Sequence, residues 1–453
     1  MSHSSASLTD GPIASGLIRF AIPILLTNLL QQLYNSVDSA VLGHWCGSIA
    51  LAAVGSTASL INLLTGFFLG FATGAGILFA MHYGAGDYEG LRKVIDSAMF
   101  LSLIFGIIMT VGGVIWTEQL TRLMDIPEET FAPSAVYLRI YMSGTVATMV
   151  YNVGAGLIRS EGDSTRPLIY LFIGGAVNMI LDLLMVAVWD MGVSGAAYAT
   201  VTAQTLTAVL VVFRLCRMNP LYAFRPLQMR PDRLTLWDIT RISIPCGIQS
   251  SMYGISNFLV QVKINSFGQA AMAGTAAYGK LDAFCYMPIT ALGLAISTYV
   301  GQNIGAGKYE RMKKGIVTAL TAAIFCSILI SGLVGKFFEP LIHIFSDDAD
   351  TLTYARDFAK YLLPCIWMFS FIDIFGGAIR GSGQTVQVTV ISLLCICLFR
   401  VIWLEATLRI YNDILFVYLC YPVSWILCAF VTLWYYYRHS TLHKSVLLKC
   451  SVR

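Results

Sequence analysis

Charged residues are scarce in this sequence. Of its 453 residues, 12% are charged and 57% are hydrophobic, whereas a soluble globular domain is about 25% charged. The mean hydropathy is +0.71. This composition excludes an ordinary cytosolic enzyme, a disordered protein and a coiled coil. The formal net charge is only +4, so a nucleic-acid partner is not expected.

The sequence also lacks the motifs that most often mark catalysis. It contains no G-x-x-x-x-G-K-[ST] loop for nucleotide phosphates, no H-E-x-x-H metal motif and no G-x-S-x-G nucleophile elbow. The eleven cysteines form no C-x-x-C pair, and most lie in apolar runs, where cysteine behaves as a small hydrophobic residue. We therefore expect no enzyme activity, no cofactor and no disulfide framework.

Long apolar runs dominate the chain instead. A helix crosses a bilayer core with about 20 residues, and the sequence offers twelve such runs. The polar N-terminus, MSHSSASLTDGPI, lacks the basic region of a signal peptide, so we expect the first span to be retained. The predicted fold class is all-α integral membrane, with helices at about 17–42, 50–80, 94–116, 134–158, 166–189, 193–216, 238–265, 272–301, 314–336, 354–380, 385–408 and 414–437.

Positive charge is unevenly distributed between the loops. If both termini and every second loop face the cytoplasm, that side holds most of the 29 Lys and Arg residues, including Lys444, Lys449 and Arg453 of the tail. The other loops include acidic ones at 125–129, beginning with Asp125, and at 347–350. Because basic loops stay on the cytoplasmic side, we predict a multi-pass protein of the cell (inner or plasma) membrane with both termini in the cytoplasm.

The chain repeats itself at an offset of 221 residues, and Pro23 recurs as Pro245 at 222. A register this constant indicates internal duplication. Each copy has six spans, an even number, so the two copies are parallel repeats. We predict lobes at 1–216 and 238–453, joined by a basic cytoplasmic linker at 217–237. The matching sets are Gly84, Ala85, Gly86, Tyr88, Glu89 and Lys93 with Gly305, Ala306, Gly307, Tyr309, Glu310 and Lys314, and Gly156, Ile158, Arg159 and Gly162 with Gly377, Ile379, Arg380 and Gly383.

Small residues and prolines within the spans have structural interpretations. Gly70 and Gly74 are expected to allow close helix packing rather than to bind phosphate. Pro23 and Pro245 each remove a backbone hydrogen bond and permit a bend in the first span of their half. Two parallel six-helix halves without an ATP-hydrolysing motif suggest a secondary transporter.

Polar residues recur along the first span at helical spacing. Thr27, Gln31, Tyr34, Asn35 and Asp38 fall within an arc of about 100° on an otherwise apolar helix. Charged groups inside spans are costly and are functional candidates by default. We interpret the stripe as facing a wet cavity or the bundle interior, and a polar packing seam between helices is the alternative.

The fifth and sixth spans add further oxygen ligands to this half. Asn178 and Asp182 are four residues apart, as are Thr200 and Gln204, so each pair lies on one helix face. On their own, Thr200 and Gln204 are explained equally well by hydrogen bonds to backbone carbonyls. Together with the carboxylates they favour a site for a shared proton or Na⁺, because hard oxygen ligands do not suit soft metals. No other metal site is expected.

The second half lacks this set of residues. The corresponding positions fall near Val260, Trp403 and Tyr421, so we expect the ion-coupling site to be confined to the first half. The second half has charges of its own, and in one interpretation Lys280 pairs with Asp373 on another span. A structural salt bridge and a second functional site both stay open for these residues.

Seven segments carry a family resemblance. They are QQLYNSVDSAVLGHWC at 31–46, ALAAVG at 50–55, GAGDYEG at 84–90, RSEGDSTRP at 159–167, NMILD at 178–182, GAAYAT at 195–200 and VGQNIGAGK at 300–308. In combination they resemble the multidrug and toxic compound extrusion (MATE) family, over about residues 11–440. The resemblance implies two pseudo-symmetric six-helix lobes forming a V around a central cavity, and export of organic cations in exchange for H⁺ or Na⁺.

The resemblance also assigns residues. It implies a cation-coupling site made of Asp38, Asn178, Asp182 and Thr200, the set that the helical spacing indicates. Another branch of the family has a Glu a few residues after the proline of the seventh helix, whereas the segment here, CGIQSSMYG at 246–254, has no acid. Asp373 also stands about one turn from the tenth-helix Asp of that branch. The sequence thus departs from the pattern of a second-lobe Na⁺ site.

The expected function is antiport by alternating access. A proton or Na⁺ neutralises the first-lobe carboxylates, the hold on a cationic substrate weakens, and the lobes rock. We expect amphipathic cations as substrates, the lipid bilayer as surroundings, no cofactor and a functional monomer. A flippase for a lipid-linked or other amphipathic substrate is the main alternative, and a channel or receptor is the second. Candidate substrate-cavity residues are Thr27, Gln31, Tyr34, Asn35, Tyr141, Met149, Tyr151, Gln204, Tyr253, Asn257, Lys280 and Asp373.

Overall fold

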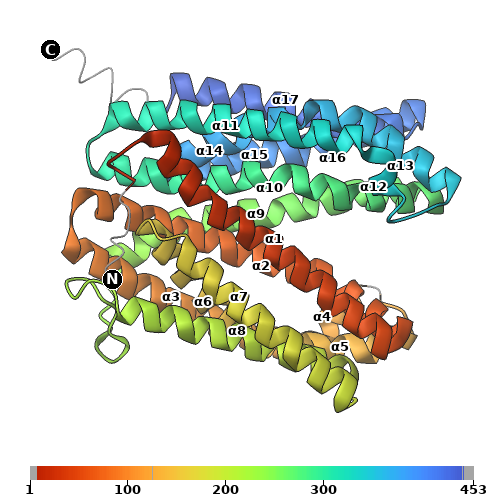
Figure 1. Cartoon of the computed structure of the whole chain (residues 1–453), viewed down its shortest axis with the longest axis horizontal. Coiled ribbons are helices and arrows are strands. Elements are labelled where there is room, and N and C mark those ends of the chain that lie inside the picture. Colours follow the sequence, from red (N-terminus) through yellow and green to blue (C-terminus); the bar gives the residue numbers. More distant parts are fainter. Residues whose placement is uncertain (1–7, 125, 441, 443–453) are drawn as a thin grey trace. The chain divides into compact units, whose positions relative to one another are not determined.

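The computed structural model of the chain describes residues 8–124, 126–440 and 442, and every element in them is helical (Figure 1). Asp125, Lys444, Lys449 and Arg453, which entered the topology prediction, lie outside the described residues. The elements of the first half are α1 (Ile13–Trp45), α2 (Gly47–Ala85), α3 (Tyr88–Ile115), α4 (Thr117–Leu123), α5 (Glu128–Ser143), α6 (Thr145–Ser160), α7 (Thr165–Asp182), the π-helical turn η1 (Leu183–Val188) and α8 (Gly192–Cys216).

The second half follows the same order after a short 3₁₀ turn in the linker. Its elements are η2 (Pro226–Gln228), α9 (Arg233–Asn265), α10 (Gln269–Gly305), α11 (Tyr309–Lys336), α12 (Phe338–Ile342), α13 (Ala349–Leu362), the 3₁₀ segment η3 (Leu363–Met368), α14 (Phe369–Gly381), α15 (Thr385–Ser392), the π-helical turn η4 (Leu393–Leu398), α16 (Phe399–Tyr411) and α17 (Leu415–Arg438).

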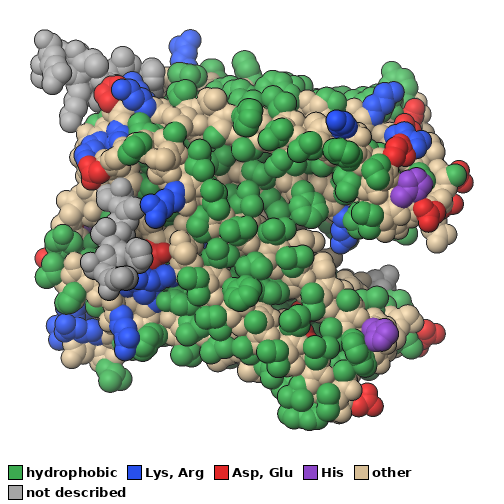
Figure 2. All heavy atoms as spheres, viewed as in Figure 1, with side chains coloured by type: hydrophobic (Ala, Val, Ile, Leu, Met, Phe, Trp, Pro, Cys, Tyr) green, Lys and Arg blue, Asp and Glu red, His purple; other side chains and the backbone are tan. Residues whose placement is uncertain are grey.

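Ten of the twelve predicted spans are helices long and apolar enough to cross a membrane, within the part of the chain that is described. The other two are α5–α6 and α9. The first is broken at Gly144 into two helices of 16 residues each, and α9 carries several charged residues along its length. Figure 2 shows hydrophobic side chains covering the middle of the visible face, with most charged ones near the helix ends. This is the surface of a multi-pass membrane protein.

Matched glycines end the helices of both halves. Gly86 and Gly307 occupy the same position of the repeat and have φ of +69° and +67°. Gly162 and Gly383, again 221 residues apart, have φ of +105° and +84°. A residue with a Cβ pays a steric penalty at such angles, whereas glycine does not. The repeated glycine motifs are therefore helix-terminating turns.

Contacts divide the described chain into two units, residues 26–247 and residues 8–25 with 248–442. The boundaries fall inside α1 and α9, in each case two residues after the matched proline, Pro23 or Pro245. The start of α1 therefore packs in the second unit, where Asp10 pairs with Lys308 at 2.8 Å. The predicted lobes at 1–216 and 238–453, with a linker at 217–237, describe the two copies of the sequence repeat and stay a prediction.

Close helix crossings within each unit depend on small residues. A Cβ on Gly70 would overlap the backbone of Cys246, and one on Gly74 would overlap Ser243. This confirms that the glycines of α2 serve packing, here against the first part of α9. Apolar side chains of α2, α3, α6 and α8 form the core of the first unit, and those of α10, α11 and α14, which run side by side, form a core of the second (Figure 1).

The linker is bound to the basic end of the first unit. The Tyr222 hydroxyl donates to Glu161 at 2.9 Å, and Arg214 donates to the same carboxylate at 3.0 Å. The Tyr222 ring stacks on Tyr88, with centroids 6.0 Å apart. Burial raises the pKa of Glu161 despite the nearby Arg214. The loops after α2, α6 and α8 therefore meet at one end of this unit.

Candidate ion-coupling site

The polar stripe of α1 turns only part of its length toward α7. The Tyr34 hydroxyl donates to the carbonyl oxygens of Leu171 and Phe172, each at 3.3 Å. Its ring lies where a Cβ on Gly175 would stand, so that glycine makes room for it. Thr27 and Asp38 are partly buried, whereas Gln31 and Asn35 are exposed. The stripe is thus neither a uniform packing seam nor a uniform cavity wall.

Asp38 of α1 and Asp182 of α7 form a carboxylate pair. Asp182 is only 1% exposed, and the two side chains interact electrostatically with each other. Three of the four carboxylate oxygens are buried without a hydrogen-bond partner among the described residues. The buried Asn178 amide nitrogen, one turn before Asp182, also lacks a partner there. Buried polar groups are rarely left unsatisfied, so such a group calls for an explanation.

The backbone changes its winding directly after Asp182. The helix α7 ends at this residue, and the π-helical turn η1 begins at Leu183. Short π-helical turns inserted into α-helices are rare and often occur at functional sites. Here the turn forms the last six residues of the span, directly after the carboxylate, a feature that hydrophobic periodicity does not predict.

A tyrosine that the sequence did not single out completes the site. The buried side chain of Tyr137 interacts with Asp38, Asp182 and Thr200, and its ring stacks on that of Tyr141, with centroids 6.3 Å apart. The Thr200 hydroxyl itself donates to the carbonyl oxygen of Ala196 at 3.0 Å. Thr200 therefore bonds to the backbone and also contacts the tyrosine that interacts with both carboxylates. Its part in a cation site stays a prediction. Helical spacing from Tyr141 was the available signal for Tyr137.

The remaining first-half candidates form a second polar group. The Thr148 hydroxyl donates to Gln204, and Tyr141 interacts with the same amide. Met149 is fully buried in the apolar core, and Tyr151 packs in the same core. These last two residues occupy packing positions rather than an open surface.

In the second unit, Asp373 is paired with an arginine of its own helix. Arg380 donates to the Asp373 carboxylate at 3.4 Å and to Gln249 at 3.3 Å. The predicted pair between Lys280 and Asp373 is wrong. Asp373 packs against Gly293 of α10, which lies about 20 Å along the helix from Lys280. Lys280 is exposed and forms no ion pair within the described residues.

Tyr253, which is partly buried, and Asn257, which is exposed, each contact a buried polar side chain of the same unit. The Tyr253 hydroxyl donates to Ser392 at 3.3 Å. Asn257 accepts a hydrogen bond from Arg400 at 3.1 Å, and the Arg400 guanidinium stacks on Tyr421 at 4.4 Å from the ring centroid. Arg400 is buried without a carboxylate partner among the described residues. The structure therefore adds an arginine to the second-half candidates.

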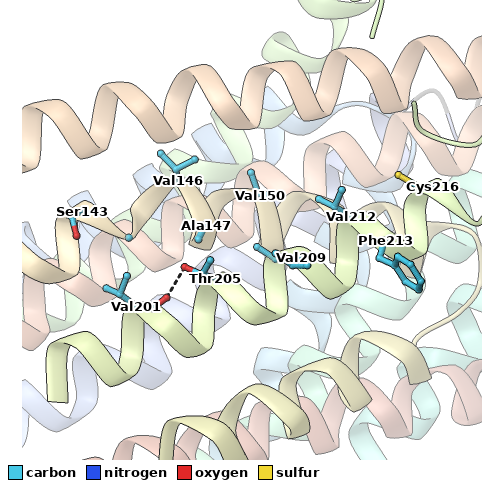
Figure 3. Close-up of a pocket in the computed structure, with 12 residues that line it drawn as sticks. Ser143, Val146, Ala147, Val150, Val201, Thr205, Val209, Val212, Phe213 and Cys216 are labelled. Atoms are coloured by element: carbon cyan, nitrogen blue, oxygen red, sulfur yellow. Dashed lines mark hydrogen bonds between the residues drawn. The ribbon is translucent and has the colours of Figure 1, made fainter. Parts of the chain in front are cut away.

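A separate groove lies on the first unit between α6 and α8 (Figure 3). It has a volume of about 620 Å³, and valines of the two helices dominate its lining. Thr205 faces it but donates its hydroxyl to Val201. No charged side chain lines the groove, so it does not suit a coupling ion. In the described residues, no cluster of three or more His, Cys, Asp or Glu side chains is placed to hold a metal.

The fold and the site define a duplicated, all-helical membrane transporter with a buried carboxylate pair in one half. The MatE family model matches the chain twice, at residues 23–184 and 245–403, and the chain therefore belongs to the MatE family, the MATE efflux transporters. Both matches begin at the matched prolines, which confirms the duplication. The family consists of transporters rather than enzymes.

Curated relatives agree with this placement. The chain is 29% identical over 388 residues to the probable multidrug resistance protein YoeA of Bacillus subtilis (strain 168), covering 83% of each chain. It is 24% identical over 392 residues to the probable multidrug resistance protein NorM of Thermotoga maritima, covering 85% of this chain and 83% of that protein.

Solved structures share the fold along the whole chain. An outward-facing multidrug resistance MATE family transporter of the MOP superfamily superimposes with a TM-score of 0.90 at 22% identity, covering 98% of this chain and 99% of the other. A MOP superfamily transporter from Pyrococcus furiosus, described as having a binding pocket of reverse polarity, gives 0.89 at 21%, with the same coverage. The twelve-helix layout of two six-helix halves is the MATE fold.

Proposed function

We propose that this protein is a secondary antiporter that exports amphipathic organic cations in exchange for H⁺ or Na⁺. Asp38, Asn178, Asp182 and Thr200 form its cation-coupling site, and Tyr137 positions the carboxylates. The observation that carries the proposal is the Asp38–Asp182 pair, buried without a cationic side chain and with three oxygens lacking a hydrogen-bond partner in the described residues.

Electrostatics gives this pair its role. Two carboxylates that face each other in a low-dielectric interior repel strongly unless a proton or a cation lies between them. A salt bridge would supply that cation permanently, but none is present among the described residues of this unit near the pair. The positive charge must then come from outside the protein. A site that gains and loses a cation can bias two conformations of the transporter, which is what antiport requires.

The proposed substrate class rests on the negative charge of the carboxylate pair. A cationic substrate competes with the coupling ion for the same negative charge, so binding of one weakens binding of the other. The names of YoeA and NorM as probable multidrug resistance proteins support a drug-like substrate. Tyr34 and Gln204, which are partly buried, provide aromatic and polar surface in the same unit for such a cation.

The proposal includes a topology. Both termini and the linker at 217–237 lie in the cytoplasm of a cell whose inner or plasma membrane holds the protein, which works as a monomer. The lobes at 1–216 and 238–453 alternate access between the two sides. The clustering of the basic loops after α2, α6 and α8 at one end of the first unit supports this orientation.

A flippase for anionic amphipathic substrates is a second candidate. Arg400 in the second unit and Arg159 in the first are buried without a carboxylate partner among the described residues, and such cations would suit a phosphate. For the Pyrococcus furiosus transporter, which shares this fold, the reverse polarity of the binding pocket is described as suggesting a different function.

Purified protein in liposomes distinguishes these functions. Uptake of ethidium into these liposomes should follow an imposed pH or Na⁺ gradient and should collapse when that gradient is dissipated. An anionic dye with a charge of the same magnitude should not be transported. Transport of a lipid-linked pyrophosphate without any ethidium movement would instead establish the flippase. Fluorescence of the dye, normalised to the amount of reconstituted protein, provides the measurement.

A further inference from the structure

A groove on the second unit is independent of the polar contacts described above. It lies between the last turns of α11 and the helices α12, α13 and η3, and has a volume of about 690 Å³, within the range of small-molecule pockets. Its floor is apolar, from Ile328, Leu363 and Pro364. A Cβ on Gly332, which also lines it, would meet no atom within 4 Å, so the missing side chain leaves the groove open.

Four charged side chains line one end of this groove. Arg356 and Glu339 form a two-fold ion pair with N–O distances of 2.9 and 3.0 Å, so their charges cancel. Lys336 and Lys360 form no ion pair within the described residues. Their ammonium groups lie 5.5 and 5.8 Å from the rings of adjacent aromatic residues, contacts that leave the positive charge in place. The end of the groove therefore has two uncompensated positive charges.

The groove spans the depth at which apolar tails meet polar headgroups. The helix α11 has 28 residues and ends at Lys336, so it is about 42 Å long, close to the full thickness of a bilayer with its headgroups. Its side chains Phe325, Leu329 and Leu333 are exposed, as expected of a lipid-facing surface. Trp367, another lining residue, is of the type enriched at the interface. In Figure 2, basic and acidic side chains gather over α12 and α13.

We propose that this groove binds an anionic phospholipid. One acyl chain lies on the surface opened by Gly332 and Gly335, and the phosphate meets Lys336 and Lys360. Basic pockets between membrane helices bind the headgroups of anionic lipids, and the attraction of one lysine to an anionic membrane surface corresponds to about a fivefold gain in binding. By the predicted topology the lipid belongs to the extracellular leaflet. The proposal does not depend on the transported substrate or on the coupling ion.

Brominated lipids provide the test, because bromine on an acyl chain quenches a nearby tryptophan. The full-length protein is placed in nanodiscs containing increasing fractions of brominated phosphatidylglycerol or brominated phosphatidylcholine. The difference in quenching between the native protein and Trp367→Phe isolates the signal from the groove. We expect that signal to reach half its maximum at a phosphatidylglycerol fraction at least fivefold lower than the phosphatidylcholine fraction.

Charge variants test whether the groove recognises a headgroup, because only then should the preference for the anionic lipid fall or rise with the charge of the groove. Lys336→Gln with Lys360→Gln should remove the preference, whereas Glu339→Gln should strengthen it by freeing Arg356. The matched control is Lys313→Gln with Lys314→Gln at the other end of α11. It loses the same amount of positive charge and should keep the preference for phosphatidylglycerol. Gly332→Leu, which enters open space, should abolish quenching by both lipids. Equal quenching by the two lipids in the native protein, or displacement by free inorganic phosphate, would overturn the proposal.

Discussion

The two halves place different chemistry at corresponding positions of the same architecture. In the first unit, Asp38 and Asp182 face each other without a cationic partner among the described residues. The matching positions of the second half fall near Val260 and Trp403, which pack in one apolar cluster with Leu404. Val260 is fully buried. The duplicated fold therefore does not require carboxylates at this place, which argues that their role in the first half is functional.

The arginines of the repeat show the reverse difference. Arg380 in the second unit has Asp373 seven residues before it as a partner. Arg159 occupies the same repeat position in the first unit, but Asn152 stands where Asp373 does, and Arg159 has no ion pair within the described residues. Gly293 leaves room for the Asp373 carboxylate, and the residue at that repeat position in the first half is Ala72.

Placing an acid in the apolar cluster of the second unit should have the largest effect on stability. Val260→Asp buries a carboxyl group among aliphatic side chains, and we expect a loss of about 3–5 kcal/mol in the free energy of unfolding. The free energy is measured by titration with sodium dodecyl sulfate in mixed micelles. Val260→Ala is the control for lost volume. A Val260→Asp protein as stable as that control would show that the cluster is wet and that the two halves are more alike than the structure indicates.

Removing the acid partner of Arg380 should cost less. Asp373→Asn leaves a largely buried guanidinium without its counter-charge, so we expect a loss of about 3 kcal/mol in the same titration. The converse change, Asn152→Asp with Ala72→Gly, copies the arrangement of the second unit into the first. It should leave stability unchanged or raise it, because Arg159 gains a partner. A clear loss in this double variant would mean that Arg159 already has a counter-ion in the folded protein.

The smallest effect is expected at Glu161, whose repeat position in the second half holds Ser382. Burial raises the pKa of Glu161 above its ordinary value, so the folded protein holds this proton more tightly than the unfolded chain. The resulting stabilisation is complete below the ordinary pKa of about 4.3 and is lost as pH rises through the higher folded-state pKa. The difference in unfolding free energy between native protein and Glu161→Gln should therefore fall with rising pH. A difference that grows with pH would show that the Arg214 ion pair outweighs burial.

Much of the fold follows from the sequence because the bilayer simplifies the rules. Apolar runs of sufficient length must be helical in lipid, and ten of the predicted spans reappear directly. The duplication follows from a constant register, and turn glycines such as Gly86 and Gly307 explain why that register is kept. The helix breaks at Gly144 and in η3 occupy corresponding positions of the repeat. They cannot be predicted from the sequence, because they depend on how one helix packs on its neighbours.

Part of the candidate site could be predicted from the sequence, and its role stays a prediction. Asp38, Asn178 and Asp182 were identified because charged and amide groups are rare in spans, and rarity is visible in a sequence. Tyr137 was missed because tyrosines are common in this chain and only tertiary contacts distinguish this one. The pair of Lys280 with Asp373 was wrong because the sequence does not show which turn of α10 faces α14.

Release of the coupling ion on substrate binding tests the central claim most directly. Purified protein in weakly buffered detergent is mixed with ethidium while a pH indicator follows protons and a tracer follows bound Na⁺. The native protein and Asp373→Asn should each release H⁺ or Na⁺ when the cation binds. Asp38→Asn and Asp182→Asn, which mimic permanently neutral carboxyl groups, should release neither. Undiminished release by both of these variants, or loss of release only in Asp373→Asn, would contradict a coupling site in the first half.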